Sequence, residues 1–221
     1  DLDEVFRRFR AFDAELAQVA RAALEQVKRP LTVVEIAAPK HPASGDFMEY
    51  EAFVASGDPE GQIDWPAEEW RAISLNYTSG TTGNPKGVVC HHRGAYLNAL
   101  GQGLEARLGS DSVYLWTLPM FHCNGWTYTW GVTAAGGTHV VQRAIVPAEI
   151  FDRIERLGVT QLCGAPTVLS MLAFAPGSDT RKLPRKVTIM TGGAAPTSTV
   201  IGAMERMGFV VIHADGLTET Y

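Results

Sequence analysis

From residue 72 onward, the sequence alternates between short apolar runs and stretches with helical spacing. Runs such as Val210-Val211-Ile212 are apolar at consecutive positions, as expected of strands that are buried on both faces. The alternation predicts an α/β fold, with a mostly parallel sheet that is flanked by helices on both faces. Strands are predicted at 72–78, 87–91, 112–117, 138–142, 160–163, 187–191 and 209–213, and helices at 93–107, 124–135, 147–157, 166–174 and 197–207.

The first 70 residues follow a different pattern. Apolar residues recur at helical spacing over 4–28 and predict one amphipathic helix, which ends before Pro30. A short strand is predicted at 31–36. Residues 38–70 are rich in Pro, Gly and acidic side chains, which indicates a long surface connection with one helical turn around 50–55.

Composition narrows the class of protein. With 46% apolar and 19% charged residues, the chain has the balance of a globular protein. A net charge of −5 with scattered basic residues argues against nucleic-acid binding. Three cysteines without a CxxC pair suit a reducing compartment, and no apolar run approaches the roughly 20 residues of a membrane span. We therefore expect a soluble, cytoplasmic protein that is not transmembrane.

Residues 77–88 form the most informative segment, a polar loop between two predicted strands. Lys86 adds a positive charge to a run of hydroxyl side chains and glycines, in which Pro85 fixes the exit of the loop. The hydroxyl and glycine residues are Thr78, Ser79, Gly80, Thr81, Thr82, Gly83 and Gly87. Hydroxyls and the main-chain N–H groups of glycines can surround an anion, so the segment suits a polyphosphate. It is not a Walker loop, because Lys86 precedes Gly87 instead of Ser or Thr. On residue types alone, the alternative is a mobile surface turn.

Three further segments follow predicted strands, at the carboxyl ends where sites lie in parallel sheets. His122 and Trp126 lie in the first, and residues alone would favour a packed histidine at a strand end. The second, Gly192-Gly193, is a tight strand-to-helix turn that lets a flat ligand approach the backbone. In the third, Thr218 can donate to a phosphate oxygen and Glu219 can bind Mg²⁺, although a polar loop would look the same.

The loop at 77–88 resembles the signature of the adenylate-forming superfamily, which contains acyl-CoA synthetases, peptide-synthetase adenylation domains and luciferases. The resemblance spans nearly all of 72–221 and, more weakly, the first 70 residues. It implies part of the N-terminal domain of such a ligase. Residues 1–70 would be the end of a first α/β subdomain with its connecting loops. Residues 71–221 would be an ATP- and acyl-binding subdomain, truncated before the ribose-binding segment and the C-terminal domain.

The resemblance also implies residue roles. Lys86, Thr218 and Glu219 would be catalytic, with Glu219 as the metal ligand, and His122, Trp126, Gly192 and Gly193 would contact the acid. The nucleotide would contact Thr78, Ser79, Gly80, Thr81, Thr82, Gly83, Lys86, Gly192, Gly193, Ala194, Asp215, Gly216 and Thr218. Asp215 departs from the family pattern, because an aromatic residue that stacks on adenine usually precedes this glycine.

The implied reaction is activation of a carboxylic acid, specifically a fatty acid, by ATP and Mg²⁺ to acyl-AMP and then to acyl-CoA, with release of pyrophosphate and AMP. The parent protein would be an AMP-forming acid–thiol ligase, and the fragment itself would be inactive. Two alternatives stay open, namely an adenylation domain that loads a carrier protein and a non-catalytic nucleotide- or acyl-binding module. The expected partners are the small-molecule acid, ATP and CoA. A homo-oligomer through an exposed sheet edge is also left open.

Overall fold

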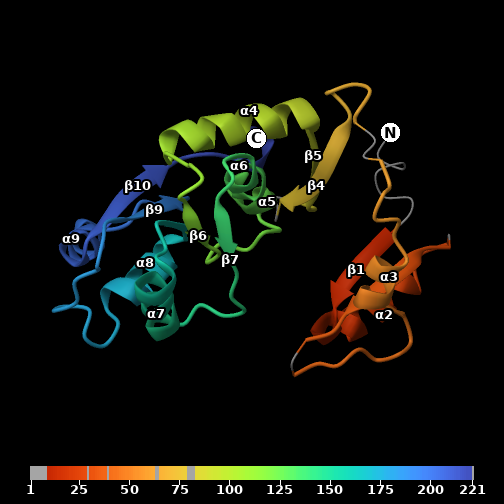
Figure 1. Cartoon of the computed structure of the whole chain (residues 1–221), viewed down its shortest axis with the longest axis horizontal. Coiled ribbons are helices and arrows are strands. Elements are labelled where there is room, and N and C mark those ends of the chain that lie inside the picture. Colours follow the sequence, from red (N-terminus) through yellow and green to blue (C-terminus); the bar gives the residue numbers. More distant parts are fainter. Residues whose placement is uncertain (1–8, 29, 39, 63–64, 79–82, 221) are drawn as a thin grey trace. The chain divides into compact units, whose positions relative to one another are not determined.

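The computed structural model describes residues 9–28, 30–38, 40–62, 65–78 and 83–220 (Figure 1). By contacts between Cα atoms the chain divides into two compact units, Asp1–Ala72 and Ile73–Tyr221. The functional assignment of these parts to two subdomains stays a prediction. Within the described ranges, no helix is both long and apolar enough to span a bilayer.

The first unit contains a small parallel sheet. Strand β1 (Phe9–Asp13) pairs with β2 (Thr32–Ile36), and β2 pairs with β3 (Met48–Glu49). A 3₁₀ turn η1 (Ala14–Leu16) and helix α2 (Ala17–Leu24) follow β1, and α3 (Tyr50–Ala55) follows β3. The strand predicted at 31–36 and the helical turn at 50–55 are confirmed.

The single helix predicted over 4–28 is wrong. Residues Phe9–Asp13 pair with Thr32–Ile36 in parallel register, and the α-helix begins only at Ala17; residues 4–8 lie outside the described ranges. A short run in which Phe9 and Ala11 alternate with Arg10 satisfies a strand as well as a helix. Pairing with β2 decides between them, because it satisfies the backbone along the whole strand.

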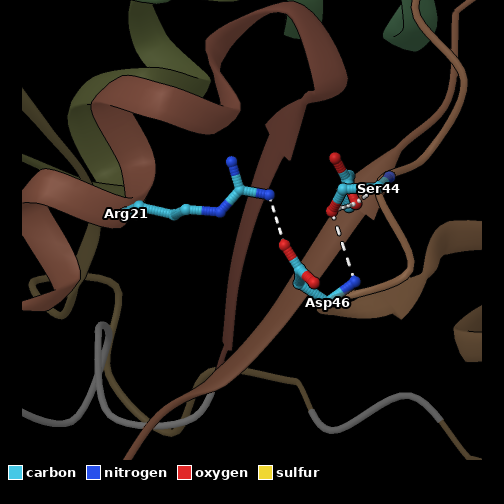
Figure 2. A network of polar contacts seen from close by, with 4 residues as sticks. Arg21, Ser44 and Asp46 are labelled. Carbon is cyan, nitrogen blue, oxygen red and sulfur yellow. Dashed lines mark hydrogen bonds and ion pairs between the residues drawn. The ribbon is translucent and has the colours of Figure 1, made fainter.

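A polar network joins the loop after β2 to α2. The fully buried Glu35 accepts hydrogen bonds at its Oε2 from the main-chain nitrogen and the hydroxyl of Ser44, at 2.8 and 2.7 Å. The Ser44 hydroxyl in turn accepts from the Asp46 nitrogen at 3.3 Å, and Asp46 pairs with Arg21 of α2 (Figure 2). These bonds satisfy Oε2, one of the two buried carboxylate oxygens of Glu35.

The second unit contains a five-stranded sheet in the order β10 (Phe209–Ala214), β9 (Val187–Gly192), β8 (Gln161–Cys163), β6 (Val113–Leu115), β7 (Thr138–Val140). Each neighbouring pair is parallel. Helices α4 (His92–Glu105) and α6 (Tyr128–Ala134) pack together, as do α8 (Pro166–Ala173) and α9 (Ser198–Met207), with α7 (Pro147–Leu157) beside α8 (Figure 1).

Two apolar clusters cover the two faces of this sheet. Leu115, Leu162 and Ile189 pack with residues of α7, α8 and α9. Their strand neighbours Tyr114, Cys163 and Met190 instead pack with Tyr128 and Val132 of α6. Adjacent strand residues therefore enter opposite cores, which explains why the strands read as continuous apolar runs. The prediction of a mostly parallel sheet covered on both faces is confirmed.

Strands β4 (Ala72–Thr78) and β5 (Lys86–His91) are found where they were predicted, but they form a separate two-stranded sheet. The helix predicted over 124–135 is wrong in its first turn. Residues Cys123–Trp126 form the short element α5, which contains non-helical dihedral angles, and α6 begins only at Tyr128. Asn124-Gly125 lies at this interruption, and both residue types tolerate the left-handed conformation more readily than most.

Candidate functional site

The candidate site lies where β6, β9 and β10 end. β6 and β9 each pair in parallel with β8, and β10 pairs in parallel with β9. The carboxyl ends of β6, β9 and β10 therefore share one edge of the sheet. Residues 118–127 follow β6, residues 193–197 follow β9, and residues 215–220 follow β10. Three of the four segments singled out in the sequence therefore begin at the same edge.

The predicted phosphate loop is described only at its two ends. Thr78, at the end of β4, is half-buried, whereas Gly83 and Lys86, at the start of β5, are exposed. Ser79, Gly80, Thr81 and Thr82 lie outside the described residues. Lys86 is thus accessible to an anion, while the enclosing shape of the loop stays a prediction.

A ring of three polar side chains joins the strand before this loop to the segment after β6. Asn124 Nδ2 donates to the Ser74 hydroxyl at 2.8 Å, and that hydroxyl donates to Asn76 Oδ1 at 3.4 Å. Asn76 Nδ2 completes the ring at Asn124 Oδ1, also at 3.4 Å, and donates to the Phe121 carbonyl at 3.1 Å. Asn76 is buried, so losing a partner would leave its amide unsatisfied. The ring therefore holds β4 against residues 121–124.

The segment after β6 has an unusual backbone. Five consecutive residues have positive φ angles: Cys123 48°, Asn124 52°, Gly125 62°, Trp126 52° and Thr127 63°. A left-handed conformation costs roughly 1–2 kcal/mol for each residue that carries a side chain. The surrounding contacts must compensate for this cost, and such strain is concentrated at functional sites.

Gly125 is required for steric reasons as well. A Cβ atom at this position would lie 2.4 Å from Cζ3 and 2.7 Å from Cη2 of Trp116. The Trp116 ring is buried in the core beneath the segment, so it has little room to move. The absence of a side chain at Gly125 therefore lets the backbone of the turn pack directly on the Trp116 ring.

Trp126 and Gly192, two predicted acid-binding residues, lie in direct contact. A Cβ atom on Gly192 would lie 2.9 Å from Cη2 and 3.1 Å from Cζ2 of the Trp126 indole. The indole thus packs on the main chain at the end of β9, in a space that a side chain at position 192 would fill. Both residues are partly buried, which suits the wall of a cavity that receives an apolar group.

A second contact links the segment after β6 to the segment after β10. The Sγ atom of Cys123 lies 3.0 Å from the hydroxyl oxygen of Thr218, and both residues are partly buried. Thr218 begins the 3₁₀ turn η2 (Thr218–Thr220). A predicted phosphate-binding hydroxyl is therefore next to the predicted acid-binding segment, although these residues are 95 positions apart in sequence.

The other predicted residues lie on the surface of this edge. His122, Ala194, Asp215, Gly216 and Glu219 are exposed. Gly193 has a φ of 83°, and its carbonyl accepts a hydrogen bond from Nε2 of His213 at 3.4 Å.

The surroundings of Glu219 limit how it could bind a metal ion. Over the described part of the chain, no group of three or more His, Cys, Asp or Glu side chains could hold a metal ion. A single exposed carboxylate fits Mg²⁺ only where phosphate oxygens and waters complete the coordination, which is how Mg²⁺ is commonly bound beside nucleotides. Glu219 is compatible with that arrangement.

Sequence reasoning missed the residues that hold the site together. Ser74, Asn76, Cys123 and Asn124 were not singled out, because the contacts that link them to one another, to Phe121 and to Thr218 span 45 to 95 positions of sequence or arise inside one strand. The Asn124-Gly125 pair was an available signal, because Asn and Gly tolerate positive φ angles.

Comparison with known proteins shows the family of the chain. The family model described as AMP-binding enzyme matches residues 5–221. Over 201 residues, the chain is 46% identical to the peroxisomal acetate/butyrate–CoA ligase AAE7 of Arabidopsis thaliana, which covers 88% of this chain and 35% of that protein. It is 47% identical to the peroxisomal trans-cinnamate:CoA ligase of Petunia hybrida, over 79% of this chain and 31% of that protein.

A solved structure supports the fold. The N-terminal domain of FACL13 from Mycobacterium tuberculosis superposes with a TM-score of 0.76 at 22% identity, covering 95% of this chain and 50% of that one. The chain spans about a third of the length of the two curated relatives, 35% and 31%. Because the family model covers nearly every residue and the relatives share almost half of the aligned positions, the chain belongs to the AMP-binding enzyme family.

Proposed function

We propose that the full-length protein to which this chain belongs is an AMP-forming acid–thiol ligase, which activates a carboxylic acid with ATP and transfers the acyl group to CoA. Family membership and the CoA-ligase names of the relatives support this proposal. The observation that carries it is the contact of Cys123 with Thr218 at 3.0 Å, beside the packing of Trp126 on Gly192. Residues suited to a phosphate and residues suited to an acid are thus neighbours.

The proposed reaction has two steps. In the first, a carboxylate oxygen of the acid attacks the α-phosphorus of ATP, the bond to the bridging oxygen breaks, and pyrophosphate leaves. In the second, the sulfur of CoA attacks the acyl carbon of the adenylate and AMP leaves. Neither step needs covalent chemistry from the protein, so the rate depends on positioning and on charge stabilisation.

On the nucleotide side, the hydroxyl of Thr218 donates to an oxygen of the α-phosphate. Thr78, Lys86 and the intervening loop hold the β- and γ-phosphates, and the ammonium of Lys86 compensates the charge of the departing pyrophosphate. Glu219 would hold Mg²⁺, which would neutralise phosphate charge. The exposure of Lys86 and Glu219 leaves both side chains accessible to these oxygens.

On the acid side, Trp126, Gly192 and Gly193 wall the pocket and His122 lies at its entrance. The Trp126 indole occupies the space above Gly192, which favours small to medium acids over long fatty acids. The sequence predicts a fatty acid, and we therefore propose one with a short acyl chain. The relatives' names span an aliphatic and an aromatic acid, acetate/butyrate and trans-cinnamate.

Asp215 favours a second candidate function, a module that binds nucleotide or acid without catalysis. Its exposed carboxylate cannot stack on adenine, and it adds negative charge near the proposed phosphate positions. Such a module would bind ATP or an acid at equilibrium but would never form an acyl adenylate. A carrier-loading adenylation domain differs instead in the second step, where the thiol of a holo-carrier replaces CoA.

ATP–pyrophosphate exchange on the full-length protein tests the first step. The panel should run from acetate and butyrate through octanoate and palmitate to cinnamate, with MgATP in excess. Exchange with a short acid is expected, and absence of exchange with every acid would remove the ligase proposal. Formation of acyl-CoA, as opposed to acyl-carrier, then identifies the acceptor.

Three further assignments are proposed, which concern the isolated chain, the location and the oligomeric state. The isolated 221-residue chain is inactive in both steps, because it spans only about a third of the ligases that it resembles; the same exchange assay on the isolated chain tests this. A cytoplasmic location rests on composition, whereas the relatives' names specify the peroxisome. Imaging of the tagged full-length protein distinguishes the two compartments, and light scattering measures whether it forms a homo-oligomer.

A further inference from the structure

The thiol of Cys123 is carried by a turn that several hydrogen bonds hold in place. Its backbone belongs to the left-handed run of residues 123–127. The adjacent Asn124 is fixed by its side-chain bond to Ser74 at 2.8 Å, and its carbonyl accepts from the Thr129 hydroxyl at 2.9 Å. The Gly125 nitrogen donates to the His122 carbonyl at 2.9 Å, which closes the turn on the other side. The backbone of Cys123 therefore has a defined position relative to the sheet, and from it the Sγ atom reaches Thr218.

Thr218 belongs to a less constrained segment. It begins a three-residue 3₁₀ turn that follows β10. The bonds of that turn are local. The Leu217 nitrogen donates to the Thr220 hydroxyl at 3.1 Å, and the Thr220 nitrogen donates to the Leu217 carbonyl at 3.1 Å. None of these bonds involves the Thr218 side chain. The orientation of its hydroxyl therefore depends on the neighbour that it contacts, which is Cys123 at 3.0 Å.

The chemistry of the two groups allows a division of roles. A hydroxyl has one hydrogen to donate and two lone pairs to accept with, and a thiol can donate weakly. When the Cys123 S–H donates to the Thr218 oxygen, the hydroxyl hydrogen is directed away from the sulfur and is free for a phosphate oxygen. When Thr218 donates to the sulfur instead, its hydrogen is no longer available to the ligand.

We propose that Cys123 is a positioning residue for the adenylation step, whose thiol orients the Thr218 hydroxyl so that it donates to the α-phosphate of ATP. This inference rests on the proposed function and goes beyond it, because it assigns a role to a side chain that does not itself bind a substrate.

The test uses four variants of the full-length protein: Cys123→Ala, Cys123→Ser, Thr218→Val and the double variant Cys123→Ala/Thr218→Val. Pyrophosphate exchange gives kcat/KM for ATP and, separately, KM for the acid. Thr199→Val, an exposed threonine in the first turn of α9, is the matched control for Thr218→Val. Thermal unfolding of every variant separates a loss of folded protein from a loss of function.

Loss of one hydrogen bond predicts a decrease of about three- to tenfold in kcat/KM for ATP with Cys123→Ala, with KM for the acid unchanged. Cys123→Ser keeps a donor at the same position and is expected to stay within about twofold of wild type. In the Thr218→Val background, Cys123→Ala should have less than about a twofold effect, because the group through which it acts is gone.

Two results would overturn the inference while the ligase proposal stands. One is a Cys123→Ala variant that matches wild type. The other is an equal fold-loss from Cys123→Ala with and without Thr218, which would mean that the thiol acts independently of that hydroxyl. Absence of exchange in the wild-type protein with every acid is a different result, because it rejects the proposed function and removes the premise of this inference together with it.

Discussion

The indole of Trp126 lies on the main chain of Gly192, so close that a Cβ atom at position 192 would be 2.9 Å from its Cη2. Gly192→Ala should therefore force the indole to move and cost about 1–3 kcal/mol of stability, as overpacking does. The cost should fall in a Trp126→Ala background, where the methyl group meets no ring. Chemical unfolding of the four proteins of this double-mutant cycle measures the coupling, and equal costs in both backgrounds would contradict the contact.

The ammonium of Lys86 is expected to bind the phosphates of the departing pyrophosphate. Loss of a charge-assisted contact costs about 1.5–3 kcal/mol, so Lys86→Ala should slow adenylation by about tenfold or more. Lys186 is also exposed and directly precedes β9. As the control, Lys186→Ala should leave the rate unchanged. Pyrophosphate exchange measures both. An unaffected Lys86→Ala rate would show that this ammonium does not contact the phosphates.

Asp215 is the departure from the family pattern that is easiest to test. Asp215→Tyr should lower KM for ATP on the order of tenfold, because a ring can stack on a base for about 1–3 kcal/mol and the carboxylate charge is removed. Asp215→Asn removes only the charge and should recover a smaller part of this gain. If Asp215→Tyr binds ATP more weakly than wild type, the carboxylate makes a favourable contact with the nucleotide that stacking cannot replace.

Gly125 and Gly177 form a matched pair. Both have positive φ angles, 62° and 78°, but a Cβ atom would meet Trp116 at position 125 and nothing within 4 Å at position 177. Each substitution by alanine should cost about 1–2 kcal/mol for the left-handed backbone. Gly125→Ala should cost about 1–3 kcal/mol more through the clash. Melting temperatures of the two variants test the difference, which would vanish if the Trp116 ring could move aside.

His139 makes stability depend on pH. Its Nδ1 accepts from Nε1 of Trp116 at 2.9 Å, and its Nε2 lies 3.0 Å from the Thr133 hydroxyl, which itself donates to the Thr129 carbonyl. The ring is therefore neutral with its hydrogen on Nε2. Partial burial lowers the pKa of His139, and an added hydrogen on Nδ1 would face the Trp116 N–H.

The sign follows from linkage. Because the pKa of His139 is lower in the folded state, the unfolded chain binds the extra proton first, at its ordinary pKa of about 6.5. The contribution of His139 to stability is complete above that pH and decreases as the pH falls below it, until the folded state also binds the proton. Urea unfolding of wild type and His139→Gln between pH 8 and pH 5 should show the steeper loss in wild type. Parallel curves would contradict this assignment.

Most elements of the parallel sheet could be predicted from the sequence, because strands buried on both faces leave continuous apolar runs such as Val210-Val211-Ile212. Candidate segments could also be chosen, since Gly192-Gly193 stands at the end of one such run and Thr218-Glu219 lies a few residues after another. Both are local signals, which depend on residue type and spacing within a single segment.

Only the tertiary structure decided what these segments contact. Residues Phe9–Asp13 have a pattern compatible with a helix, yet they form a strand because β2 offers a partner. The left-handed turn at Cys123 is bonded to Ser74 and Asn76 of β4, and its Gly125 packs against the Trp116 ring. The bonds to Ser74 and Asn76 come from groups about 50 positions away in sequence, and contacts of this long range also bring the sulfur of Cys123 to the hydroxyl of Thr218.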